Sequence, residues 1–179
     1  MKVYDDFFDE RFLNNLYYNL LLKGSWNTNS VANRYSWPFG DKGDGRALGI
    51  KFFNRVNNNI IEYSSNFNDC CDLIRCYEFF SDKIKYKGVL QEIMGNLQFP
   101  NMDGSFHDDG ADDHKSFILM LSEGTNFSGG EFINKTANEV IPFKKGRLIE
   151  ITGSDIHKGN SFKEKNSVRI TISWRTSNT

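Results

Sequence analysis

The chain has 179 residues, which suits one domain with a buried core, and it contains 16 Phe, 7 Tyr and 3 Trp to fill that core. A formal net charge of -1 gives it no general attraction to nucleic acid or to an anionic membrane surface. The N-terminus lacks the charged and apolar regions of a secretory signal, and no apolar run approaches membrane-spanning length. Three clustered cysteines, Cys70, Cys71 and Cys76, argue against a disulfide framework. The sequence therefore predicts a soluble, intracellular protein of the cytoplasm that has no membrane contact.

Two amphipathic helices are predicted in the N-terminal half. Over residues 5 to 23, apolar side chains recur at spacings of three and four, as they do along one face of a helix. They are Phe8, Phe12, Leu13, Leu16 and Leu20. Asp5 or Asp6 is expected to cap the start of this helix, and Gly24 to end it. A similar pattern predicts the second helix over residues 69 to 80.

Residues 25 to 46 differ in composition from both helices, because they combine aromatic residues with a glycine-rich turn region. One interpretation is a surface loop whose aromatic side chains anchor it to the core. The alternative is a flap, centred on residues 37 to 46, that closes over an active site. A strand is predicted directly after this segment, over residues 48 to 56.

After Gly88 the pattern becomes strand-like and stays so. Strands are predicted over residues 89 to 99, 117 to 121, 131 to 133, 147 to 152 and 168 to 175, with a further one leading through His107. Several short strands separated by Gly-rich turns indicate a double-sheet jelly roll, with the preceding helices packed on an outer face. The predicted fold is mostly β with N-terminal helices (α+β). One domain is expected over residues 1 to 179, with helical support and a loop over 1 to 88 and the jelly-roll core over 89 to 179.

His107 and Asp109 form the first candidate for a metal site. Side chains two residues apart in an extended chain point to the same face, so this pair can hold one ion from one side. A third ligand is then expected far along the chain, and His157 is the better of the two remaining histidines. His114, which is expected to lie in a loop, is the rival. Two histidines and one carboxylate form the facial triad of non-haem Fe(II) sites, which leaves positions open for a co-substrate and O2.

Arg169 is the candidate for binding an anion. From residue 168 to 175 apolar residues occupy every even position, so a strand would place Arg169, Thr171, Ser173 and Arg175 on its other face. A buried guanidinium needs a counter-charge, and a carboxylate-bearing co-substrate would supply one. An internal salt bridge to Glu150 is the alternative.

These features together resemble the 2-oxoglutarate- and Fe(II)-dependent oxygenases, and within them the prolyl 4-hydroxylase-like branch. The resemblance rests on His107-x-Asp109, His157, Arg169, Gly129-Gly130-Glu131 and the segment Pro142 to Leu148, and it covers roughly residues 89 to 175. It implies a double-stranded β-helix that binds Fe(II) and 2-oxoglutarate, with ascorbate as a supporting reductant. By the same resemblance His107, Asp109 and His157 hold the iron, Arg169 pairs with the far carboxylate of 2-oxoglutarate, and Thr171 supplies the hydroxyl of an Arg-x-Ser/Thr pattern.

The sequence departs from this branch at one position. Prolyl hydroxylases commonly carry a Tyr in the strand after His-x-Asp that helps to hold 2-oxoglutarate, and here Met120 or a neighbouring aliphatic residue takes that place. Asn96 and Gln98 are candidate replacements, because polar residues at matching offsets touch 2-oxoglutarate in the nucleic-acid demethylating relatives.

Three functions follow from the sequence. The favoured one is a dioxygenase that uses O2, 2-oxoglutarate and Fe(II) to hydroxylate a prolyl or other residue of a protein or peptide, or a small molecule. The second is a nucleic-acid demethylase of the same superfamily, which the near-neutral charge disfavours. The third is a non-catalytic jelly roll with a structural metal such as Zn2+. Arg169 separates the third from the others, because a metal store needs no inward-facing anion anchor.

Overall fold

A computed structural model describes residues 1–30, 47–56, 60–63, 67–123 and 126–178. Two helices lie within it, α1 (Glu10–Lys23) and α2 (Phe67–Lys83). The strands are β1 (Lys2–Tyr4), β2 (Asn27–Ser30), β3 (Ala47–Val56), β4 (Ile60–Tyr63), β5 (Val89–Gln98), β6 (Lys115–Met120), β7 (Phe132–Asn134), β8 (Glu139–Ile141), β9 (Leu148–Thr152), β10 (His157–Gly159) and β11 (Arg169–Ser177). The flap considered for residues 37 to 46 lies outside the described residues.

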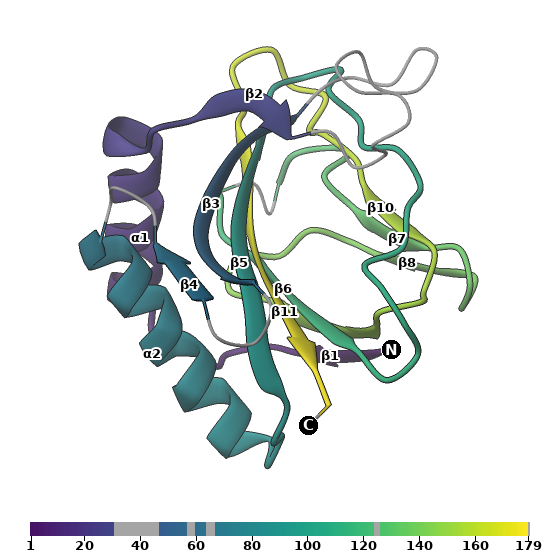
Figure 1. Ribbon diagram of the computed structural model, residues 1–179. Helices are drawn as coiled ribbons and strands as arrows, with labels where there is room; N and C mark the ends of the chain where they lie inside the picture. The colour runs from purple at the N-terminus through teal and green to yellow at the C-terminus, as the bar shows by residue number, and fades with distance from the viewer. Residues whose placement is uncertain (31–46, 57–59, 64–66, 124–125, 179) are drawn as a thin grey trace.

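The strands form two antiparallel sheets. The larger sheet has the order β1-β9-β6-β11-β5-β3-β2, with β4 paired to β3, and the smaller one has the order β10-β7-β8. Both helices stand on the outer face of the larger sheet, and the smaller sheet lies on its other side (Figure 1). The predicted fold is therefore confirmed: a mostly β jelly roll with helices packed outside it.

The first helix begins later than predicted. Asp9, rather than Asp5 or Asp6, is its N-cap and accepts a hydrogen bond of 2.8 Å from the backbone N–H of Phe12. Asp6 has a φ of 62°, which breaks helical geometry at that residue. Residues 2–4 pair with β9, and Asp5 is bonded to Arg147 and Lys144, so long-range contacts hold the chain outside the helix up to this point.

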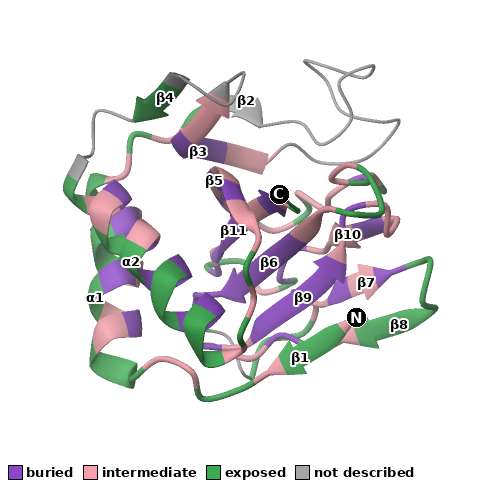
Figure 2. Cartoon of the chain, turned by 60° about the horizontal axis from the view of Figure 1, so that its bottom comes forward, coloured by how far each residue is buried: buried purple, intermediate pink, exposed green. Residues whose placement is uncertain are grey.

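The main hydrophobic core lies between the helices and the larger sheet. Apolar side chains of α1, including Leu16 and Leu20, pack here with α2 and with the even-numbered side chains of β11. Trp174 of β11 is fully buried, and its indole Nε1 donates a hydrogen bond of 2.9 Å to the carbonyl oxygen of Leu73 in α2. Figure 2 shows the buried inner faces of both helices. This core holds β11 rigidly, which matters because the opposite face of β11 lines the candidate site.

A second apolar cluster lies between the two sheets. Its members are Ile118, Met120, Phe132, Phe143, Ile149, Ile151 and Phe162. The smaller sheet packs through this cluster against β6 and β9, and the space next to it, where β11, β5 and β10 approach one another, is the candidate site. The cluster thus fixes the distance between the two sheets at the pocket.

The N-terminal part of the chain contributes strands as well as helices. The predicted strand over 48 to 56 is confirmed as β3, which pairs with β5 along its length. β1 pairs with β9 at the other edge of the larger sheet. The sheet that carries the candidate site is therefore built from both ends of the sequence.

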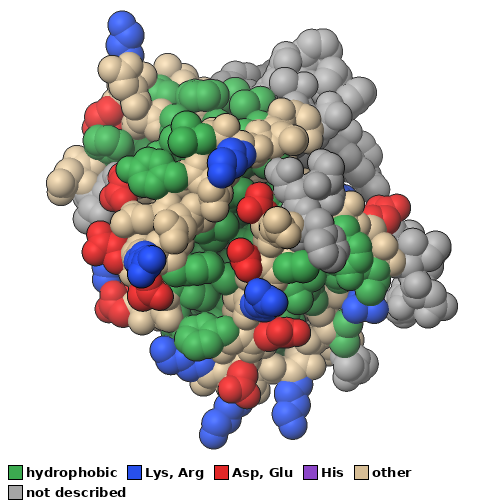
Figure 3. Space-filling model, turned by 90° about the vertical axis from the view of Figure 1, so that its left-hand side faces the viewer, with side chains coloured by type: hydrophobic (Ala, Val, Ile, Leu, Met, Phe, Trp, Pro, Cys, Tyr) green, Lys and Arg blue, Asp and Glu red, His purple; other side chains and the backbone are tan. Residues whose placement is uncertain are grey.

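The outer face of the helices carries apolar side chains between charged ones (Figure 3). Tyr18, Leu22 and Phe79 are more than half exposed. In the described part of the chain, neither helix is long and apolar enough to cross a membrane.

Asp5 is expected to stabilise the protein in a pH-dependent way. Its carboxylate accepts two hydrogen bonds of 2.9 Å from Arg147, which are the main reason that its pKa falls to about 2, and Lys144 adds to this effect. A carboxyl with a lowered pKa stabilises the fold above its unfolded pKa of about 3.9 and loses this contribution as the pH falls through the folded value. We therefore expect Asp5→Asn to lower the free energy of unfolding by about 1 kcal/mol at pH 7, and by less as the pH falls from 5 to 3.

Urea unfolding of both proteins at several pH values measures this difference. Asp6→Asn is the matched control, because the Asp6 side chain is 88% exposed and should give wild-type stability throughout. A difference for Asp5→Asn that is the same at pH 3 and pH 7 would contradict the ion-pair explanation.

Candidate metal and 2-oxoglutarate site

Three side chains predicted as metal ligands meet at one point. His107 and His157 are paired across an isolated antiparallel bridge, in which each backbone N–H donates to the other's carbonyl oxygen at 3.0 and 2.9 Å. Asp109 is held next to them by a bond of 2.8 Å from its N–H to the carbonyl oxygen of Gly153. The predicted strand through His107 is thus reduced to a single bridge. That bridge is enough to bring together residues that lie 50 positions apart in the sequence.

The two imidazole rings are oriented by their own backbone neighbours. Nδ1 of His107 lies 3.0 Å from the carbonyl oxygen of Ser105, and Nδ1 of His157 lies 2.8 Å from that of Asp155. A carbonyl oxygen can only accept, so each Nδ1 carries the proton and each Nε2 keeps its lone pair. Phe132 stacks against the His157 ring, with centroids 5.3 Å apart. Both rings therefore present a metal-binding nitrogen to the same space.

Charges in this cluster suit a cation. Burial alone would raise the pKa of Asp109, but the charge of Arg175 and the two nearby histidines hold it below its usual value, so the carboxylate is ionised. Burial lowers the pKa of His157, which keeps that imidazole neutral at neutral pH. The carboxylate oxygens lie 3.6 Å from the Nε2 atoms of His107 and His157. Adjacent ligand atoms around an octahedral ion with bonds of about 2.1 Å are roughly 3 Å apart, so a small adjustment completes the site.

The Asp109 carboxylate already has one cationic neighbour. Its buried Oδ1 lies 2.5 Å from Nη2 of Arg175, although no hydrogen bond of good geometry reaches it within the described residues, and its Oδ2 faces His157. Two carboxylate oxygens offer about four acceptor positions, so Asp109 can bind a cation alongside Arg175. The rival ligand His114 is 38% exposed and lies 3.8 Å from Asp113 instead. Of the residues described, the group that could hold a metal is His107, Asp109 and His157.

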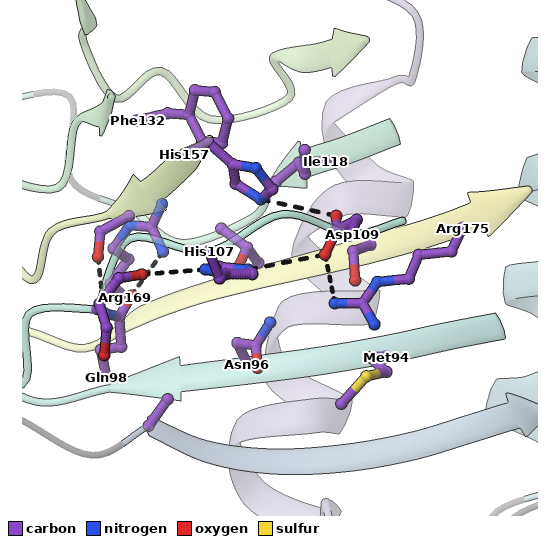
Figure 4. Close-up of a pocket in the computed structure, with 16 residues that line it drawn as sticks. Met94, Asn96, Gln98, His107, Asp109, Ile118, Phe132, His157, Arg169 and Arg175 are labelled. Atoms are coloured by element: carbon purple, nitrogen blue, oxygen red, sulfur yellow. Dashed lines mark hydrogen bonds and ion pairs between the residues drawn. The ribbon is translucent and has the colours of Figure 1, made fainter. Parts of the chain in front are cut away.

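A pocket of about 220 Å³ extends from this triad between the sheets (Figure 4). Its floor is the face of β11 that carries Arg169, Thr171, Ser173 and Arg175, which confirms the predicted alternation of this strand. Asn96 and Gln98 of the neighbouring strand β5 also line it. The structure therefore brings together all of the residues that the sequence predicted for metal and co-substrate.

Arg169 is a buried cation, and no carboxylate among the described residues is paired with it. Its side chain contacts two uncharged acceptors in the described part of the chain, the carbonyl oxygen of Gly130 at 3.0 Å and Oε1 of Gln98 at 2.6 Å. Burial lowers its pKa to about 10, against the opposing influence of the more distant Glu131 and Asp103, so it stays protonated at neutral pH. A buried charge of this kind is costly unless an anion pairs with it.

The alternative partner considered for Arg169 does not contact it. Glu150 lies on β9, where it accepts a hydrogen bond of 2.7 Å from the hydroxyl of Tyr4 and pairs with Lys2 at 3.5 Å. β9 is separated from β11 by β6. The alternative of an internal salt bridge between Arg169 and Glu150 is therefore wrong.

Gln98, which lines the pocket, accepts a hydrogen bond from Arg169 and helps to fix its side chain. Its Oε1 accepts from the guanidinium, while its Nε2 donates to the carbonyl oxygens of Met102 at 2.7 Å and Gly159 at 3.1 Å. The amide nitrogen thus fixes the orientation of Gln98, and the amide oxygen is turned toward the arginine. A Cβ at position 159 would lie 2.7 Å from Nη2 of Arg169, so a side chain there would displace the guanidinium.

Two features of the pocket were not assigned from the sequence. Ile118, two residues before Met120 on the same face of β6, lines the pocket, and both residues belong to the cluster between the sheets. Arg175 turns back to the triad and lies 2.5 Å from Asp109 (Figure 4). The alternation along β11 placed Arg175 on the correct face, but its partner was not predictable.

No protein-family model matches the sequence, and no curated protein matches it in a sequence comparison. Solved structures do match. An oxidoreductase of the 2OG-Fe(II) oxygenase family from Burkholderia pseudomallei aligns with a TM-score of 0.72 and 16% identity, over 96% of this chain and 81% of that one. The viral collagen prolyl hydroxylase of Paramecium bursaria Chlorella virus-1, in a 2OG complex, aligns with a TM-score of 0.65 and 16% identity, over 98% and 95% of the two chains.

A prolyl hydroxylase of Trichoplax adhaerens, in complex with a peptide of hypoxia-inducible factor, aligns with a TM-score of 0.69 and 10% identity, over 99% of this chain and 83% of that one. Together with the His-Asp-His group, these likenesses define the class: this chain has the fold of the 2OG-Fe(II) oxygenases. Within that class, it shares its architecture with prolyl hydroxylases.

Proposed function

We propose that this protein is a 2-oxoglutarate- and Fe(II)-dependent dioxygenase that hydroxylates a prolyl or other residue of a protein or peptide. The observation that carries the proposal is the combination, in one pocket, of a His-Asp-His group with a buried arginine that no carboxylate contacts in the described part of the chain. A dicarboxylate that chelates a metal at one end and needs a counter-charge at the other fits both features. A jelly roll with a purely structural metal would explain the triad but leave Arg169 unexplained.

We assign the residues as follows. His107, Asp109 and His157 hold Fe(II), and Arg169 binds the far carboxylate of 2-oxoglutarate through its planar fork, with the hydroxyl of Thr171 beside it. Bound together, Fe(II) and 2-oxoglutarate supply the activation of O2 that inserts one oxygen atom into a C–H bond and leaves succinate and CO2.

The protein's part in this chemistry is positioning and exclusion of water. Ile118 and Phe132 form the apolar wall beside the triad, and this wall keeps bulk water from the metal. The two imidazole rings keep the orientation that presents Nε2 to the metal, because each Nδ1–H donates to a backbone carbonyl oxygen.

The substrate class rests on the architectural likeness to prolyl hydroxylases, one of which carries a bound peptide. A nucleic-acid substrate is disfavoured by the formal net charge of -1, which provides no general attraction to phosphates. Small-molecule substrates are the second candidate, because an epimerase and a carbocyclase from nogalamycin biosynthesis also share the architecture.

An anaerobic titration tests the proposal without a substrate. Addition of Fe(II) and then 2-oxoglutarate is expected to produce a weak visible charge-transfer band, because the keto acid chelates the iron. Succinate is the matched control, since it carries both carboxylates but no keto group and should produce no band. Retention of Fe(II) with no band at saturating 2-oxoglutarate would contradict the proposal. In a later turnover assay, ascorbate would serve as the supporting reductant.

A further inference from the structure

Arg175 makes the shortest ion pair of the pocket with one of the assigned metal ligands. Its Nη2 lies 2.5 Å from Oδ1 of Asp109, and its Nη1 lies 3.0 Å from Oε2 of Glu92. Glu92 is itself held at 2.7 Å by Lys51. Figure 4 shows the Arg175 guanidinium directed back toward Asp109 from β11. Four charges of alternating sign thus run across β3, β5 and β11 and end at the triad.

The position of Arg175 follows from strand register. Arg175 and Glu92 are directly opposite each other in the pairing of β11 with β5, so their side chains leave the sheet on the same face. That face is the pocket face, six residues along β11 from Arg169. A guanidinium has donors on two sides of a planar fork and can bridge two carboxylates, which the ammonium of lysine does less well.

The orientation of the Asp109 carboxylate has to be fixed by a neighbouring residue. Its side chain is 3% exposed, and a carboxylate can rotate about its last bond and turn either oxygen toward the histidines. The contact with Arg175 selects one orientation: Oδ1 lies between Arg175 and His107, while Oδ2 faces His157. Because Glu92 and Lys51 fix the arginine in turn, this orientation exists before any metal arrives.

We propose that Arg175 is a positioning residue, which holds the Asp109 carboxylate in the orientation that receives the metal. The proposal rests on the proposed function, because it takes Asp109 as a ligand. Arg175 does not need a substrate anion to balance its charge, since two carboxylates already do so. The competing explanation is that Arg175 merely neutralises Asp109 in the absence of metal, in which case its loss would leave metal binding unchanged or make it tighter.

Titration with Co2+, an inert visible probe of this site, separates the two explanations. Loss of a residue that orients a metal ligand typically weakens metal binding by about 10- to 100-fold, and we expect this range for Arg175→Met. We expect Arg175→Lys to recover only part of this loss, because a point charge cannot bridge Asp109 and Glu92. Glu92→Gln should weaken Co2+ binding in the same direction but less, because it releases one anchor of the arginine. The Co2+ absorption bands of the Arg175 variants should shift, since they report the ligand geometry.

Arg147→Met is the matched control. This arginine also pairs with an aspartate, at 2.9 Å from Asp5, but it lies outside the pocket. It should bind Co2+ with wild-type affinity and spectrum even if the protein is less stable. Melting temperatures measured on the same samples separate loss of fold from loss of binding.

The outcomes are distinct. Wild-type protein that fails to bind Co2+ would overturn the proposed function itself. Wild-type binding together with unchanged or tighter binding by folded Arg175→Met would overturn the role of Arg175 alone. If Arg175→Met does not fold, unchanged affinity and spectrum in both Arg175→Lys and Glu92→Gln would overturn that role equally.

Discussion

His107→Ala is expected to abolish metal binding and, with it, all turnover of 2-oxoglutarate. His107 contributes one of three ligand atoms that lie within 4.8 Å of one another, and its ring is already oriented by the carbonyl oxygen of Ser105. Even outer partners of metal ligands cost about 10- to 100-fold in affinity when they are removed, so loss of a ligand should exceed about 100-fold. Equilibrium dialysis with Fe(II), or with Mn2+, Co2+ or Ni2+ as inert replacements, measures the loss.

His114→Ala provides the control for the first experiment. His114 lies in a neighbouring loop and is oriented toward Asp113, so its removal should leave stoichiometric metal bound. The opposite result, with metal retained by His107→Ala and lost from His114→Ala, would show that the ligands have been chosen incorrectly. Melting curves of both variants without metal should be similar, because neither imidazole belongs to an apolar core cluster.

Arg169→Met should leave the metal in place and raise the dissociation constant for 2-oxoglutarate by roughly 100-fold. The triad is untouched by this change, whereas the pocket loses its buried cation. Removal of one partner of a buried, hydrogen-bonded charge pair costs about 2 to 5 kcal/mol, and 3 kcal/mol corresponds to about 100-fold in affinity. Titration of the visible band of the Fe(II) complex with 2-oxoglutarate gives the constant directly.

Stability must be measured on the same Arg169 samples. Methionine fills a similar volume without a charge, so the variant should fold at least as well as the wild type in the absence of co-substrate. Arg169→Lys should recover part of the affinity, because the charge is kept but the fork that bonds to Gly130 and Gln98 is lost. A folded Arg169→Met variant with normal 2-oxoglutarate affinity would contradict the assignment, and a variant that fails to fold would indicate a structural role instead.

The sequence by itself determined the parts of this protein that depend on local periodicity. Alternation over residues 168 to 175 predicted a strand with one apolar and one polar face, and β11 has both. The spacing of His107 and Asp109 placed their side chains on one side of the chain, and both line the pocket. Such inferences succeed because side-chain direction in an extended chain follows from backbone geometry alone.

The tertiary structure decided the features that depend on which segments meet. The first helix begins after Asp9 rather than at Asp5 or Asp6, because Asp6 has a φ of 62° and Asp5 is held by Arg147 and Lys144. Gln98 was a candidate to contact 2-oxoglutarate, and it does line the pocket, but its amide is bonded to Arg169, Met102 and Gly159, which only the fold brings together.

The contact of Arg175 with Asp109 is another feature that the tertiary structure decided. Periodicity indicates on which face an arginine lies, yet which carboxylate it meets depends on strand order and register, and on a single bridge that draws residues 107 and 157 together. Strand order, register and this bridge are set by long-range pairing and packing. The energies of these interactions are spread over many residues, so no short stretch of the sequence encodes them.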